Sequence, residues 1–371
     1  MLSKAKHLAV SSPYEKQILR LRLRMTLGSL KFAKEEFMRL TSHFLLFVMI
    51  ALAPAHLHAQ TAQSALIEGA KKEGKLVWYT SMAIDTSKPL LDAFLKEYPF
   101  IKAELVRAGE EQLMNRILSE TRAGKWLFDA VSTSAMSVLV ERRMTAPYLP
   151  PERDAFLSEF KDAQGHWTGI FVNNLVLGYN TSMLPVKEAP KNYADLVDPK
   201  WKGKMLMDST DYDWFGTLST VWGKEKTVEY MKRLALQNPL WRRGHGLTAQ
   251  LLGAGEVPLA WAYNFRLERM KNDGAPVDWI ETFDPIVVTV SGLGLSAKAT
   301  NPNSAKLLID FATSKKGQQM VRGMRRIPAR TDIEPLAPKM DQSKLKLKAV
   351  PKEVYLHLDD YAREFRKIFG M

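Results

Sequence analysis

LVWYTS, at residues 76–81, is a short apolar and β-branched run, and it predicts a buried strand. A helix is expected before it over 63–73, in a stretch that ends at Gly74. A second helix is expected after it over 88–98, where the large apolar side chains fall on one face. A strand between two helices is the repeating unit of an α/β sheet, so this stretch indicates the fold class.

The same alternation continues along the chain and predicts an α/β fold with helices on both faces of the sheet. Further strands are expected at 101–106, 128–132, 172–179, 204–208, 257–261, 277–281 and 285–290. Further helices are expected at 110–123, 191–196, 224–236, 264–273 and 303–313, and one more begins near Asp213. No sequence repeat interrupts this pattern.

The ends of the predicted strands indicate where a ligand would bind, because ligands of open α/β sheets bind at the carboxyl ends of strands. The positions selected by this rule follow Thr80, Val131, Met207 and Trp261, or surround Asn173. The serine and threonine hydroxyls that lie near Thr80 and after Val131 either hydrogen-bond a ligand or cap the next helix. The ligand-binding residues predicted there are Thr80, Ser81, Ser132, Thr133 and Ser134.

Two later loops offer charged and aromatic groups. The loop WRRGHG at 241–246 precedes a helix. Its cationic side chains either bind an anion or are solvated on an exposed turn. The segment STDYDW at 209–214 enters another helix, and its polar residues cap that helix or contact a ligand. The ligand-binding residues predicted in these loops are Asp211, Trp214, Arg243 and His245.

The sequence contains no GxSxG, HExxH or P-loop motif, so no catalytic residue is assigned. It has no cysteine, which excludes disulfides, thiolate metal sites and cysteine nucleophiles. The three histidines after residue 60 do not lie at metal-ligand spacing from one another. We therefore expect a protein that is not an enzyme and that carries neither a cofactor nor a resident metal.

The segment 44–55 reads FLLFVMIALAPA and predicts a secretory signal peptide with cleavage near Ala59. Arg39 precedes this apolar run, which is too short to span a bilayer. We expect translation to begin at Met38, because a signal peptide of ordinary length would then result. The formal net charge of +13 is compatible with an anionic ligand and equally with solubility alone.

Several motifs together resemble one protein family. They are KLVWYTS at 75–81, FDAV at 128–131, LVLGYNTSMLP at 175–185, NYADLVDPKWKGKM at 192–205, GEVPLAW at 255–261, NPNSAKLLIDFATSKKGQQ at 301–319 and IPARTD at 327–332. With these motifs the chain resembles the family 1 extracellular solute-binding proteins of ABC transporters, in particular the branch of ferric-iron-binding proteins. The resemblance covers nearly all of residues 60–335.

The resemblance implies a two-lobed periplasmic-binding-protein fold with two crossover hinge strands, near 172–179 and 286–294. Lobe one would be discontinuous and formed by 60–171 and 286–371. Lobe two would be formed by 172–285. The lobes would close on the ligand by bending at the hinge.

The resemblance also implies a position for the ligand. Ferric-iron-binding relatives hold the metal with two adjacent tyrosines at the start of the helix after the GE-containing strand. At that position this chain has Tyr263 followed by Asn264. One phenol and one amide are a poor ligand pair for Fe³⁺, which prefers several anionic oxygen donors. Tyr263 and Asn264 are therefore predicted to hydrogen-bond an organic solute, together with Asn173 and Asn174 at the first hinge. Tyr263 would be a metal ligand if the solute were ferric iron.

These inferences predict the periplasmic substrate-binding component of an ABC importer, which binds a small anionic organic solute between its lobes. Ferric iron is the alternative solute, and an exported enzyme on the same fold is the second alternative. The expected partners are the small-molecule ligand and an ABC permease in the inner membrane. No nucleic acid is expected to bind, and the protein is expected to be a monomer.

Overall fold

The computed structural model describes Gln17 and residues 63–371. The predicted signal peptide, its cleavage near Ala59 and the expected start at Met38 lie outside the described residues. The chain divides into two compact units after Ala65, and the fold described below is that of the second unit, Leu66–Met371. No helix among the described residues is long and apolar enough to cross a membrane.

One mixed sheet runs through the second unit, with the strand order β2-β1-β3-β10-β5-β8-β6-β7. These strands are β1 Lys75–Thr80, β2 Lys102–Arg107, β3 Ala130–Thr133, β5 Thr168–Asn180, β6 Met205–Asp208, β7 Leu240–Arg242, β8 Leu259–Tyr263 and β10 Ile286–Ser296. The short strands β4 Thr145–Ala146, β9 Val277–Trp279, β11 Ile327–Pro328 and β12 Leu347–Ala349 pair beside this path.

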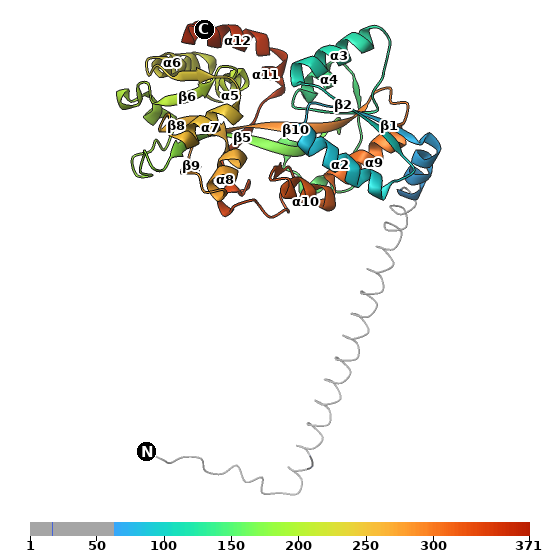
Figure 1. Cartoon of the computed structure of the whole chain (residues 1–371). Coiled ribbons are helices and arrows are strands. Elements are labelled where there is room, and N and C mark those ends of the chain that lie inside the picture. The colour runs from blue at the N-terminus through green and yellow to red at the C-terminus, as the bar shows by residue number, and fades with distance from the viewer. Residues whose placement is uncertain (1–16, 18–62) are drawn as a thin grey trace. The chain divides into compact units, whose positions relative to one another are not determined.

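The two longest strands, β5 and β10, pair antiparallel in the middle of the strand order. On one side of this pair, β1 is parallel to β2 and β3; on the other side, β6 is parallel to β7 and β8. Figure 1 shows β5 and β10 running between these two groups of elements. We call the elements on the β3 side the first half and those on the β8 side the second half.

Helices cover the sheet, which confirms the predicted α/β class. The α-helices are α2 Ile84–Glu97, α3 Glu110–Arg122, α4 Met136–Glu141, α5 Tyr212–Trp222, α6 Lys224–Ala235, α7 His245–Ala254, α8 Asn264–Asn272, α9 Pro302–Thr313, α10 Lys315–Gly323, α11 Lys352–Leu356 and α12 Leu358–Phe369. Short 3-10 helices lie at Arg153–Ala155, Ser158–Phe160, Tyr193–Val197, Pro199–Trp201 and Pro338–Met340. An additional helical segment covers 63–73, as predicted.

The C-terminal helices depart from the predicted lobe boundaries, which put all of 286–371 in lobe one. Helix α11 contacts α4 of the first half and α5 of the second, and α12 packs against α5 and α6 (Figure 1). Phe365 of α12 is fully buried, and its ring lies 5.6 Å from that of Tyr212 and 5.7 Å from that of Trp241. The aromatic face of α12 thus finds its apolar partners in the second half.

Candidate ligand-binding site

Six helices follow directly after strands of the sheet, and most of the predicted site residues lie where these helices begin. In the first half α2, α3 and α4 follow β1, β2 and β3; in the second half α5, α7 and α8 follow β6, β7 and β8. In none of the six does the side chain of the N-cap residue cap the helix. The free N–H groups of the first turn therefore carry partial positive charge.

Glu110, the first residue of α3, organises the hydroxyl groups of the first half. Its carboxylate accepts hydrogen bonds from the hydroxyls of Thr133 at 2.5 Å, Ser134 at 2.9 Å and Ser81 at 2.9 Å. The N–H of Ala135 donates to the same carboxylate at 2.9 Å. The structure thus brings three predicted site residues together around an acid that the sequence reasoning missed.

Thr80 and Ser132 lie in the interior, so they do not offer hydroxyls to a ligand as predicted. Both side chains are fully buried, and their hydroxyl oxygens are 2.6 Å apart. The indole N–H of Trp78 also donates to Ser132, at 3.1 Å. These strand-end hydroxyls instead satisfy one another and the neighbouring buried indole.

Asn173 on β5 holds an arginine between the two halves. Its side-chain oxygen accepts a hydrogen bond from Arg326 at 2.8 Å. The guanidinium carbon of Arg326 lies 4.1 Å from the ring centre of Phe171 and 4.3 Å from that of Phe265, the second residue of α8. Burial and the neighbouring Arg266 lower the pKa of Arg326 to about 10, so its side chain stays charged at neutral pH.

Two of the predicted amides are fully buried. Asn174 donates a hydrogen bond to the side-chain oxygen of Gln342 at 3.2 Å, on the opposite face of β5 from Asn173. Asn264 begins α8, and neither atom of its amide has a partner among the described residues. An unpartnered buried amide is costly, so Asn264 has unused hydrogen-bonding capacity for a ligand.

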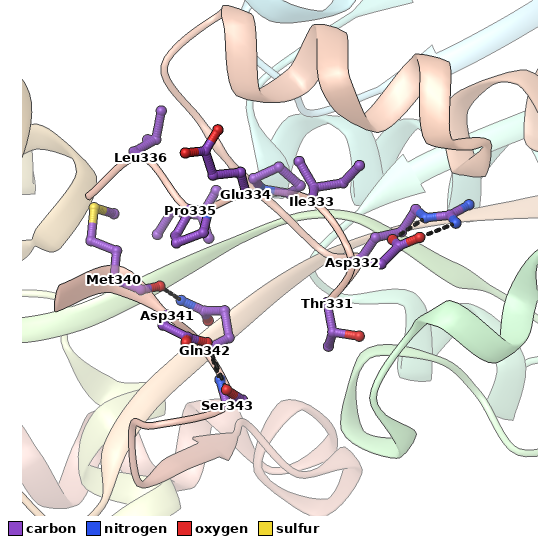
Figure 2. A pocket seen from close by; sticks show the side chains of 13 residues that line it. Thr331, Asp332, Ile333, Glu334, Pro335, Leu336, Met340, Asp341, Gln342 and Ser343 are labelled. Carbon is purple, nitrogen blue, oxygen red and sulfur yellow. Dashed lines mark hydrogen bonds and ion pairs between the residues drawn. The ribbon is translucent and has the colours of Figure 1, made fainter. Parts of the chain in front are cut away.

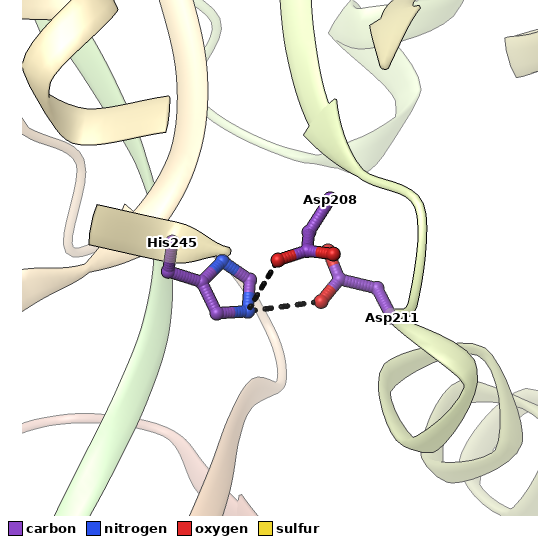
Figure 3. Close-up of side chains that lie close together, drawn as sticks. All are labelled: Asp208, Asp211 and His245. Atoms are coloured by element: carbon purple, nitrogen blue, oxygen red, sulfur yellow. Dashed lines mark ion pairs between the residues drawn. The ribbon is translucent and has the colours of Figure 1, made fainter. Parts of the chain in front are cut away.

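Asp208, Asp211 and His245 form a compact cluster in the second half (Figure 3). The Nε2 atom of His245 lies 3.0 Å from Asp211 and 4.0 Å from Asp208. Asp208 already accepts hydrogen bonds from the N–H of Gly244 at 2.7 Å and from the hydroxyl of Thr210 at 2.8 Å. The three side chains lie close enough to hold a metal ion. The hydrogen bonds of Asp208, however, go to the two loops beside it and stabilise their conformation.

The charge of His245 depends on its acidic neighbours. Burial alone would lower the pKa of His245, but the Asp211 carboxylate, reinforced by Asp208 and Asp213, raises that pKa to about 9. His245 is therefore a cation at neutral pH. Burial raises the pKa of Asp213 to about 6, with a further contribution from Asp211. The helix start at α5 thus gathers acids around one imidazolium.

Two phenols lie beside this cluster. The ring centre of Tyr263 is 4.3 Å from that of His245, and burial together with the carboxylates of Asp213 and Asp211 raises the pKa of Tyr263. Tyr355 on α11 has a buried hydroxyl that lies near Ser134 but makes no well-formed hydrogen bond among residues 63–371. Burial, Asp213 and Glu110 raise the pKa of Tyr355 well above its ordinary value. Helix α11 contacts α4 of the first half and α5 of the second, so Tyr355 lies between the halves.

Trp214 lies in the core of the second half rather than facing a ligand as predicted. Its side chain is 1% exposed, and its indole N–H donates to the hydroxyl of Tyr193 at 3.4 Å. Its ring centre is 5.2 Å from that of Trp261. Asp213, the preceding residue, interacts electrostatically with Asp211 and His245 instead.

Arg243 is exposed and lines a cavity of about 890 Å³ between the two halves. Glu111 and Asn115 of α3 form one wall, and Arg363 and Arg366 of α12 form part of the other. Ser209, Thr210 and Tyr212, the chain neighbours of the acidic cluster, also line it. The predicted cation therefore lies at an opening beside the cluster and not within it.

A second cavity, of about 330 Å³, lies under the segment that joins β11 to β12 (Figure 2). Its lining includes Arg330, which forms a pair with Asp332 at 2.8 Å, and Gln342. None of the predicted site residues lines this cavity. Its ion pairs fix the segment in place, which is a structural role.

The charge of His245 makes folding stability depend on pH. The folded-state pKa of about 9 lies above the ordinary value of 6.5, so the stabilisation is complete below pH 6.5 and is lost as the pH rises through about 9. We expect the free energy of unfolding to fall by roughly 3 kcal/mol across this window. Urea unfolding of the wild type and of His245→Gln at pH 6.5, 7.5, 8.5 and 9.5 measures the effect. Parallel pH dependence in the two proteins would contradict it.

Comparisons with known proteins agree with this architecture. The model of a family described as bacterial extracellular solute-binding protein matches residues 127–351. The Fe(3+)-binding periplasmic protein of Serratia marcescens is 24% identical over 324 residues, which cover 81% of this chain and 95% of that protein. Iron-bound HitA from Pseudomonas aeruginosa has a TM-score of 0.70 at 20% identity, over 79% of this chain and 99% of that chain. AfuA from Actinobacillus pleuropneumoniae, with exogenous fructose-6-phosphate bound, has a TM-score of 0.65 at 24% identity, over 79% of this chain and 97% of that chain.

The two structural matches confirm the predicted periplasmic-binding-protein fold. The matched family consists of solute-binding proteins, which agrees with the prediction that this chain is not an enzyme. The family model covers more than half of the chain, including six of the seven motifs in full. The chain belongs to the bacterial extracellular solute-binding protein family.

Proposed function

We propose that this protein is the periplasmic solute-binding component of an ABC importer and that it closes on a small organic solute with an anionic group. On this proposal the two halves are lobes, β5 and β10 are the hinge strands, and a membrane permease receives the solute. A relative in Sinorhizobium fredii, 28% identical over 109 residues, is named as a probable ABC transporter periplasmic-binding protein, which supports this role. The fructose-6-phosphate bound to AfuA supports an anionic organic solute.

The observation that carries the proposal is the unpartnered amide of Asn264 at the uncapped start of α8. Asn264 precedes Phe265, whose ring lies 4.3 Å from the guanidinium carbon of Arg326. A helix start with free N–H groups and a nearby cation is a favourable place for a carboxylate or phosphate. The solute's anionic group would satisfy donors that the protein leaves unused.

Arg326 supplies the cation of this proposed site. Its Nε atom is buried and has no partner among the described residues, while Nη2 bonds to Asn173. The guanidinium also lies against Phe265 of α8, which places it beside the helix that Asn264 begins. An arginine held in place by two rings and one amide is preorganised to bind an oxyanion.

Titration calorimetry with fructose-6-phosphate, glucose-6-phosphate, citrate and the unphosphorylated sugars tests this function. We expect at least one anion to bind and its neutral counterpart to bind far more weakly. Arg326→Gln should weaken that binding at least about tenfold, because a charged hydrogen bond in a desolvated site is lost. The neighbouring exposed Arg325 provides the matched control, and Arg325→Gln should bind as the wild type does. The proposal would be overturned if none of the anions binds, or if Arg326→Gln binds with the affinity of the wild type.

Ferric iron is a second candidate because the structure supplies a second phenol near Tyr263. The pKa of Tyr355 responds to Tyr263 as well as to Asp213, so both phenols and an acid share one region. Phenolate and carboxylate oxygens are donors that a hard cation prefers. Ferric citrate should then give a phenolate-to-iron absorption band, and Tyr355→Phe and Tyr263→Phe should each weaken it. A colourless mixture would exclude iron.

A further inference from the structure

The acids at the start of α5 are more numerous than the cations that balance them. Asp208, Asp211 and Asp213 face one imidazolium, that of His245. Asp208 is satisfied by backbone and hydroxyl donors of its own loops. The other two acids are therefore those that could bind a ligand.

Each of these two acids has an oxygen to spare. Asp211 is 3% exposed and pairs with His245 through Oδ1, while its buried Oδ2 has no partner among the described residues. Asp213 is partly buried; its Oδ1 accepts the N–H of Trp214, and no described side chain donates to its Oδ2. For Asp211, a buried carboxylate oxygen without a donor is costly, and a ligand's donor would remove that cost.

Tyr355 gives the second, independent indication of a ligand. It comes from the C-terminal segment, outside the sheet, and its hydroxyl is buried near Ser134 without a well-formed hydrogen bond in the described part of the chain. Helix α11 is held on the first half by the Lys352–Glu141 ion pair at 2.5 Å. On the second half it packs closely on α5 at Gly216, where an added Cβ would lie 2.6 Å from Val354. Tyr355 is thereby held between the halves.

We propose that the solute also carries a protonated amine, and that Asp211 and Asp213 bind this amine beneath the ring of Tyr355. The inference rests on the proposed function, since it adds a second charge to the same solute. Two carboxylates supply acceptors for an ammonium group, and a phenol ring supplies a favourable face. Tyr263 lies between the two subsites, because its ring is 4.3 Å from that of His245 and 6.1 Å from that of Phe265, which packs on Arg326. The solute is therefore zwitterionic, with its anionic end near Arg326 and α8.

A divalent metal ion is the competing occupant of the acidic cluster. A metal bound by Asp208, Asp211 and His245 would have to replace the bonds of Asp208 to Gly244 and Thr210 and the His245–Asp211 pair. An amine needs none of these changes, because it uses the spare oxygens of Asp211 and Asp213. The existing bonds therefore favour the amine.

Titration calorimetry with matched probes tests the inference. The pairs are glucosamine-6-phosphate with glucose-6-phosphate, and phosphoethanolamine with ethyl phosphate; Zn²⁺ and Mn²⁺ are titrated separately. In the wild type we expect at least one aminated probe to bind about tenfold or more tightly than its partner. Asp213→Asn should abolish that preference and leave the affinity for the probe without the amine unchanged. Arg326→Gln should weaken both members of the pair.

Each outcome separates the two proposals. Equal affinity within both pairs would overturn the ammonium subsite and leave the anionic function standing. Binding of glucosamine or ethanolamine alone, with no contribution from phosphate, would overturn the anionic function and support the subsite. No binding by any probe would count against both. If Zn²⁺ or Mn²⁺ binds tightly, and this binding survives Asp213→Asn but is lost in Asp211→Asn, the cluster is a metal site and the amine subsite is wrong. Thermal melts check that the nearly isosteric variants are folded.

Discussion

Gln318→Leu should destabilise this protein by roughly 4 kcal/mol, because it removes a buried side chain that satisfies four backbone groups at once. Gln318 is fully buried in α10. Its amide N–H groups donate to the carbonyls of Ile170 and Ala312 at 2.9 and 2.8 Å. Its oxygen accepts the N–H groups of Ala329 and Arg330 at 2.9 and 3.2 Å. Leucine would fill a similar space and remove all four bonds. The carbonyl of Ala312 and the N–H of Arg330 would lose their partner, while the N–H of Ala329 and the carbonyl of Ile170 would keep the bond between them at 3.3 Å.

The next residue provides a matched control for this prediction. Gln319 is exposed on the same helix, so Gln319→Leu makes the same chemical change without burying an unsatisfied group. We expect that variant to lie within about 0.5 kcal/mol of the wild type. Chemical unfolding of the three proteins measures the difference. Equal losses in the two variants would show that the hydrogen bonds of Gln318 contribute nothing specific.

Trp214→Ala should also cause a large loss of stability, about 3–5 kcal/mol, since Trp214 belongs to the core. The ring of Trp214 lies 6.3 Å from Tyr193 and 5.2 Å from Trp261, and Tyr193 in turn stacks 5.9 Å from Trp261. Removing the indole leaves a cavity that these rings cannot fill without moving. Urea unfolding midpoints measure the loss, and Trp214→Phe should recover part of it.

Leu236→Ala is the control for the core substitution, because Leu236 is 71% exposed in the same half. Its removal should change the free energy of unfolding by no more than about 0.5 kcal/mol. If instead Trp214→Ala unfolds like the wild type and fails only to bind a solute, the original prediction of a ligand contact would be restored.

Much of the fold could be predicted because its central strands are short apolar runs between amphipathic helices. β1, predicted over 76–81, is observed at Lys75–Thr80, and β6, predicted over 204–208, at Met205–Asp208. The strand at Thr145–Ala146 was missed, because two residues show no periodicity. It forms through its pairing with β10 and leaves no pattern of its own in the sequence.

The site was only partly predictable from the sequence. The strand-end rule pointed to Asp211 and Asn264, which the structure places at the starts of α5 and α8. It could not find Arg326 or Tyr355, because neither follows a strand of the main sheet, and tertiary packing alone brings them between the halves. It also assigned Trp214 to the ligand, since a helix start does not reveal which of two consecutive side chains faces the core.

The central position of β10 has a consequence for the order in which the chain folds. β3 pairs with β10, and the carboxylate of Asp129 accepts the backbone N–H of Asn301 from 172 residues further along the chain. Contacts between residues so far apart form more slowly than contacts between neighbours along the chain. Until they form, the edge of β3 that faces β10 is open to wrong partners.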